Sequence, residues 1–267
     1  MSPARLPPAL HRGALSRVSA EDAPAWGAEV VSSNIVGYEK IALSAGNTLV
    51  GVQFTEVGGT DLSLATVGTL PSEDDGVTED GDFVTTLKCW TGNGYKTYGW
   101  SGSAGTDLLD NPELDNQWLD ADLAPADADA EVSSGFWVKA PKASTLTISG
   151  EVPSDASIEV PVAAGANIVA NPYPVATKIS EFGQLDSSFA GITEDGDFVN
   201  TLKVWTGNGY VTYGWSGTAG TDLLDNPSLD NKWLDSDLQI VTTEIPYGTA
   251  VWIKTEKAGT LTFSNPL

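Results

Sequence analysis

A chain of 267 residues that is 41% hydrophobic and 9% aromatic is long enough to bury a sizeable core, which excludes a disordered acidic tail. Its formal net charge of −23 excludes nucleic acid as a partner, because such a surface repels phosphate backbones. No apolar run approaches the ~18 residues of a membrane span, so no spanning helix is expected.

The first 30 residues differ in charge and composition from the rest of the chain. The first 20 residues contain no acid but hold all the arginines and the only histidine, namely Arg5, Arg12, Arg17 and His11. From residue 21 onward the chain contains all 36 acidic residues and 10 lysines, which gives a net charge of −26. Residues 1–30 lack the apolar core of a standard signal peptide. We expect either an arm that docks on a neighbouring subunit or an atypical start.

Two strands are expected directly after this segment. Apolar residues alternate from Ile35 to Leu43, a Gly46-Asn47 turn follows, and a second extended run covers 48–54. Partial alternation of this kind is typical of half-buried strands. Residues 61–67 are expected to form one helical turn.

The stretch 76–123 contains a strong hairpin signal. Strands are expected at 83–90 and 95–100, joined by Thr91-Gly92-Asn93-Gly94, since Asn and Gly take the positive φ that hairpin turns require. Asn111-Pro112 is a plausible cap and first residue of a short helix. Strands at 135–140 and 145–149 end this part of the chain.

The same pattern then returns. Residues 191–238 align with 76–123 without a gap and match at 40 of 48 positions. Outside this block the similarity persists only as a pattern, so either constraint on the block or local gene conversion explains its near-identity. Tandem units of about this size indicate duplicated domains. We expect an arm at 1–30, a first domain at 31–149 (repeat 1) and a second at 150–267 (repeat 2).

Composition and pattern together indicate the fold class. Gly, Thr, Val, Asp, Ser and Trp are plentiful and long straight-chain helix formers are scarce, which favours short strands joined by tight turns. The sequence predicts an all-β protein with two tandem antiparallel β-sandwich-like or jelly-roll-like domains and short helical turns. Cys89 has Val204 as its counterpart, which indicates a small buried hydrophobe.

Four segments resemble β-rich tandem repeat modules of bacterial secreted and cell-surface proteins. They are AGANIVANPYP at 164–174, LKVWTGNGY at 202–210, GFWVKA at 135–140 and TLTISGEV at 145–152. Repeat 1 departs from the pattern, with Val52-Gln53-Phe54 where repeat 2 has Asn-Pro-Tyr. The resemblance implies an exported, extracellular or cell-surface all-β protein, without implying a ligand.

The inventory of reactive side chains argues against an enzyme. The body of the chain has no histidine, which removes Ser-His-Asp and Cys-His arrangements and imidazole zinc sites. Phosphate loops and dinucleotide fingerprints are absent as well. Paired carboxylates remain, but a glycosidase needs a deeper cleft than units this small are expected to form.

Two acidic loops are candidates for a calcium site. Each has three carboxylates around a glycine: Glu79, Asp80 and Asp82, then Glu194, Asp195 and Asp197. Oxygen ligands at close spacing suit Ca²⁺. The spacing does not match an EF-hand loop, so the alternative is that Asp-Gly forms a turn and the carboxylates are solvated.

Aromatic residues recur at matched positions in the two copies. We expect Trp137 and Trp252, in the most apolar strands, to be core residues. We expect Trp100 and Trp215, which follow glycine, to be exposed enough to contact a ligand such as a sugar ring, together with Tyr98 and Tyr213. The alternative is that such aromatics fill the core or seal an interface between modules.

These observations predict a non-enzymatic extracellular structural or cell-surface protein. Its expected partners are copies of itself, assembled head-to-tail into a fibre, filament or surface layer, because heterologous contacts propagate unless they close. The alternative is a carbohydrate- or partner-binding surface module, for which Ca²⁺ is the candidate cofactor.

Overall fold

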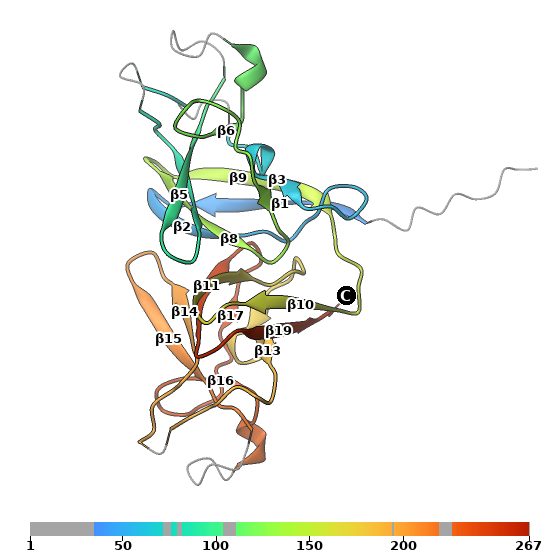
Figure 1. The fold of residues 1–267 in the computed structure, drawn as a ribbon, viewed down its shortest axis with the longest axis vertical. Coiled ribbons are helices and arrows are strands. Elements are labelled where there is room, and N and C mark those ends of the chain that lie inside the picture. The colour runs from blue at the N-terminus through green and yellow to red at the C-terminus, as the bar shows by residue number, and fades with distance from the viewer. Residues whose placement is uncertain are drawn as a thin grey trace, which may run out of the picture. The chain divides into compact units, whose positions relative to one another are not determined.

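The computed structural model describes residues 35–71, 76–78, 82–103, 111–193, 195–218 and 226–266, and throughout these ranges the chain is all-β, as predicted. Its strands pair antiparallel in every sheet (Figure 1). The only helical elements described are single 3-10 turns, so no helix of the described residues is long enough to cross a membrane.

Repeat 1 contains a two-stranded sheet and a five-stranded sheet. The strands of the first are β1 (Val36–Leu43) and β9 (Ser144–Glu151). Those of the second, in spatial order, are β2 (Gly46–Gly51), β8 (Gly135–Ala140), β4 (Thr86–Trp90), β5 (Tyr95–Trp100) and β6 (Trp118–Leu119). A short pair, β3 (Leu62–Ser63) and β7 (Asp129–Ala130), lies beside them.

Repeat 2 has the same plan with one added strand. Its first sheet orders β10 (Ser157–Val162), β19 (Gly259–Ser264) and β13 (Gln184–Leu185). Its second sheet orders β11 (Gly165–Ala170), β18 (Ala250–Thr255), β14 (Thr201–Trp205), β15 (Tyr210–Trp215) and β16 (Trp233–Leu234). The short pair is β12 (Thr177–Lys178) with β17 (Glu244–Ile245).

Alternation along the strands gives each repeat its own core. In β1 the side chains of Ile41 and Leu43 point inward while Lys40 and Ala42 are exposed. The inward faces of the two sheets meet in one apolar cluster per repeat. Cys89 is half-buried against the cluster of repeat 1, and burial raises the pKa of its thiol to about 11, which agrees with its interpretation as a small hydrophobe.

The helical turns occur close to where the sequence predicts them. They are η1 (Leu64–Thr66), η2 (Pro112–Leu114), η3 (Ile179–Glu181) and η4 (Pro227–Leu229). Asn111 caps η2 by accepting a hydrogen bond from the backbone N–H of Glu113 at 3.1 Å. Proline at the next position needs no such partner, so the turn begins there.

Asn34–Leu267 forms one compact unit. The boundary between domains at 149/150 therefore stays a prediction.

Candidate functional site at the junction of the two repeats

The two five-stranded sheets carry a second apolar face that points away from their own cores. In β8, Phe136 and Val138 face the core of repeat 1, whereas Trp137 belongs to a separate cluster. That cluster joins both repeats and consists of Leu49, Trp137, Ala170 and Ala250, with Ile168, Trp205 and Trp252 at its margin. Strands buried on both faces become almost continuously apolar. Trp137 is a buried core residue, as expected, and Trp252 is partly buried against the same cluster, so both lie at the interface between the repeats.

The contacts across this junction come in matched pairs. Trp90 donates its indole N–H to the carbonyl of Ala166 at 2.9 Å. Its counterpart Trp205 donates to the carbonyl of Asn47, the counterpart of Ala166, at 3.1 Å. Since each contact has its reciprocal, the repeats meet through the same surface, as two subunits do around a two-fold axis.

The aromatic rings at the junction also pack in two matched pairs. Trp90 packs edge-to-face on Trp252 with ring centroids 5.2 Å apart, and Trp205 packs edge-to-face on Trp137 at 5.4 Å. Trp90 and Trp205 are counterparts, as are Trp137 and Trp252, so this is one arrangement used twice. Edge-to-face pairs at this distance contribute roughly 0.5–1.5 kcal/mol beyond the area that they bury.

Two backbone hydrogen bonds also cross the junction reciprocally. The N–H of Gly51 donates to the carbonyl of Gly248 at 2.8 Å, and the N–H of Ala170 donates to the carbonyl of Ser133 at 2.7 Å. Both donors are the last residues of edge strands, β2 and β11. The ends of these edge strands are therefore tied to the other repeat rather than left for another chain.

The residues at the centre of this symmetric contact differ between the two repeats. Gly51 pairs with Gly135 in repeat 1, and their counterparts Ala170 and Ala250 pair in repeat 2. A methyl group built on Gly51 would overlap the Cβ of Ala170, and one on Gly135 would overlap the Cβ of Ala250. Two glycines thus face two alanines, which allows the sheets to approach closely without leaving a void.

The buried side-chain amide of Gln53 also links the two repeats. Gln53 is 1% exposed and donates through Nε2 to the carbonyls of Asn171 and Tyr173, both at 2.9 Å. Its Oε1 accepts the backbone N–H of Gly248 at 2.9 Å. Gln53 belongs to the segment in which repeat 1 departs from the Asn-Pro-Tyr pattern, and the departure supplies three bonds between the repeats.

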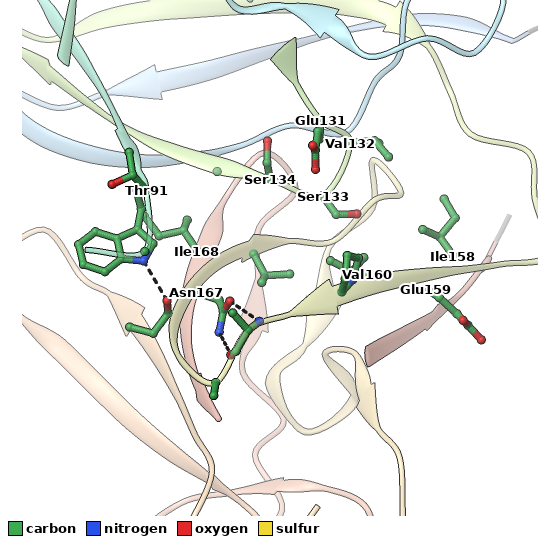
Figure 2. A pocket seen from close by; sticks show the side chains of 18 residues that line it. Thr91, Glu131, Val132, Ser133, Ser134, Ile158, Glu159, Val160, Asn167 and Ile168 are labelled. Atoms are coloured by element: carbon green, nitrogen blue, oxygen red, sulfur yellow. Dashed lines mark hydrogen bonds between the residues drawn. The ribbon is translucent and has the colours of Figure 1, made fainter. Parts of the chain in front are cut away.

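A cavity of about 430 Å³ lies beside the junction (Figure 2). It is lined by the end of β4, the loop 131–135, β10 and β11. Its chemistry is mixed: Ile158, Val160 and Ile168 are aliphatic, and Glu159 carries a charge. The amide of Asn167 is already bonded to the backbone of Ala163, as the dashed lines in Figure 2 show.

Replacing the indole N–H tests the reciprocal contacts. Trp90→Phe and Trp205→Phe keep a ring in place but remove one hydrogen bond each, so each variant is expected to lose about 1 kcal/mol of unfolding free energy. The double variant is expected to lose about the sum, since the two bonds involve different partners. Urea unfolding measures all three. A large effect at one tryptophan with none at its counterpart would contradict the reciprocity.

The aromatic residues predicted to contact a ligand do not lie on an accessible surface. Trp100 and Trp215 are 0% exposed and Tyr98 is 2% exposed, while Tyr213 is partly buried against the core of repeat 2. The expectation that both tryptophans are exposed is wrong. The glycine before each, Gly99 or Gly214, makes room for a phenylalanine ring, that of Phe83 or Phe198, rather than for a ligand.

The acidic loops are described only in part. Asp82, Asp195 and Asp197 are exposed, whereas Glu79, Asp80 and Glu194 lie outside the described residues. Within the described residues no group of three or more His, Cys, Asp or Glu is placed to hold a metal ion. The backbone N–H of Thr78 donates to the carbonyl of Asp82 at 2.8 Å. The calcium site stays a prediction.

Comparison with known proteins gives no match to a family model, a curated protein or a solved structure.

Proposed function

We propose that this chain is a non-enzymatic structural protein of the cell exterior that assembles with copies of itself. The observation that carries the proposal is the outer edge of β1, since in the described residues β1 pairs only with β9. Ile35, Val36 and Tyr38 are 61%, 62% and 70% exposed along it. An unpaired strand edge with exposed apolar side chains is a template for a strand of another molecule.

The equivalent edge in repeat 2 is protected. Where β1 has Tyr38, Lys40 and Ala42, the paired register gives β10 Ser157, Glu159 and Pro161. Proline cannot donate a hydrogen bond to an added strand, so Pro161 interrupts the edge of β10. Of these two edges β1 is the acceptor, and we propose that its complement is a different surface of the next copy. Such heterologous contacts propagate instead of closing in a pair.

Charge supports the first 20 residues as that complement. They contain every arginine and no acid, whereas the rest of the chain has a net charge of −26. Opposite charges on two parts of one chain attract between copies and are screened by salt. Residues 1–34 lie outside the described residues, so their part in assembly is a proposal from charge alone. The resemblance to bacterial surface modules supports the extracellular location.

The test compares assembly of wild type and two kinds of variant. We expect wild type at low salt to give high-mass species in size exclusion and electron microscopy. Deletion of residues 1–30, or the change Val36→Lys/Tyr38→Lys, is expected to abolish them. Ser157→Lys on β10 is the matched control and is expected to leave assembly unchanged. Wild type that stays strictly monomeric at high concentration and low salt would refute the proposal.

A further inference from the structure

A second cavity opens along the exposed edge of β1. Its volume is about 350 Å³, and it is lined by Tyr38, Glu39, Lys40, Phe54, Pro174 and Tyr247. Pro174 and Tyr247 belong to repeat 2, so the cavity lies where the junction of the repeats reaches the strand edge.

The cavity is lined by the buried carboxylate of Glu39, which is not fully hydrogen-bonded. Glu39 points inward with Ile41 and Leu43 and is only 5% exposed. Its Oε1 has no hydrogen-bond partner. The carboxylate lies against Gly248, where any side chain would collide with it. An isolated buried charge is costly, and burial raises the pKa of Glu39 to about 7.

Aromatic residues line the cavity together with Glu39. Tyr38 and Tyr247 are 70% and 53% exposed, and Phe54 is buried behind them. Aromatic faces attract cations, and the attraction strengthens when the cation is desolvated. Tyr38 and Lys40 line the cavity as well, but their side chains leave the opposite face of β1 from Glu39 and are exposed.

The equivalent position on the other side of the junction can be compared with this cavity. It forms part of the cavity shown in Figure 2. There Ile158 takes the position of Glu39, Val132 that of Tyr247, and Ser133 that of Gly248. Repeat 1 could hold an aliphatic residue at this position, as repeat 2 does. The buried acid and its aromatic neighbours are therefore particular to one corner.

We propose that this cavity binds a guanidinium or ammonium group, with Glu39 as the counter-ion and Tyr247 as a wall. The favoured source is an arginine from residues 1–20 of a second copy, because every arginine of the chain lies there and the cavity follows the edge that a second copy would pair with. This choice of source rests on the proposed function, whereas cation binding itself does not.

Thermal unfolding of the full chain with arginine amide tests the site. At pH 8 we expect the ligand to raise the melting temperature of wild type by about 2–4 °C more than that of Glu39→Gln. Tyr247→Ala removes an exposed wall and is expected to reduce the shift without affecting folding. Glu159→Gln, an exposed glutamate on β10, is the matched control and should keep the full shift.

The pH dependence gives a second readout. Because the folded pKa of Glu39 is raised, its protonated form stabilises the fold at low pH, and this stability is lost as pH rises from about 4.5 to about 7. Arginine amide is expected to act above this window and to have little effect at pH 5. Equal shifts for wild type and Glu39→Gln at pH 8 would overturn the proposal.

Full-length Arg5→Gln/Arg12→Gln/Arg17→Gln distinguishes the sources. If this variant and Glu39→Gln both lose the high-mass species, the arginines of a second copy occupy the cavity. If arginine amide binds through Glu39 while both variants still assemble, the cation site stands and its occupant is a free amine. If wild type assembles but arginine amide raises the melting temperatures of wild type and Glu39→Gln equally, the cation site is refuted. The proposed function is then unaffected.

Discussion

Gly51→Ala is expected to lower the free energy of unfolding by about 1–3 kcal/mol, the usual cost of overfilling a packed contact. The added methyl group would overlap the Cβ of Ala170, which cannot move independently of its backbone. Ala170→Gly introduced into the same chain removes the opposing methyl and is expected to restore most of the lost stability. The measurement is urea unfolding of both single variants and the double variant.

Gly94→Ala is the matched control for this pair. A methyl group added at Gly94 would meet no neighbouring atom within 4 Å, so its replacement is expected to change stability by less than about 0.5 kcal/mol. Gly135→Ala should be rescued less completely by Ala250→Gly, because the new methyl would also press on Ile168 and the carbonyl of Val50. Additive effects of Gly51→Ala and Ala170→Gly would contradict the close approach of the sheets.

Gln53→Leu is expected to destabilise the chain by about 3 kcal/mol, because a buried polar group that loses its only partner costs roughly 1–3 kcal/mol. Leucine has nearly the same size but leaves the carbonyl of Asn171 and the N–H of Gly248 without the partner that Gln53 supplies, while the carbonyl of Tyr173 keeps the N–H of Val175. Chemical denaturation of wild type and variant measures the loss.

Gln117→Leu serves as the control for Gln53→Leu. Gln117 also donates its side-chain amide to a carbonyl, that of Glu113, but this bond is exposed and water can replace it. We expect a change below about 0.5 kcal/mol. If Gln53→Leu were as mild as this control, the three bonds of Gln53 would not hold the repeats together.

The strands and turns of this protein could be predicted because they depend on local pattern. The hairpin at 91–94 is an example: Thr91 N–H donates to the carbonyl of Gly94 at 2.9 Å, and Gly92 takes the positive φ that such a turn requires. The same local logic failed at Trp100, where the preceding glycine suggested exposure. Only the structure shows that Gly99 receives the ring of Phe83, a residue from another part of the repeat.

The junction depends on partners far apart in the sequence, which no local pattern contains. The departure at Gln53 was visible, but its meaning needed Gly248, 195 residues away. The outward face of Trp137 was hidden for the same reason, since an apolar strand does not tell which of its faces meets a second sheet. Glu39 did carry a signal: it is in phase with the inward-pointing Ile41 and Leu43.

The facing Gly51 and Ala170 also have an evolutionary consequence. In a symmetric pair of separate identical chains, any substitution near the axis appears on both sides at once, so a methyl group there would always meet another methyl group. Joining both copies in one gene frees the two sides to mutate separately. One side can then become smaller as the other becomes larger, which avoids both the clash of two facing alanines and the gap between two facing glycines.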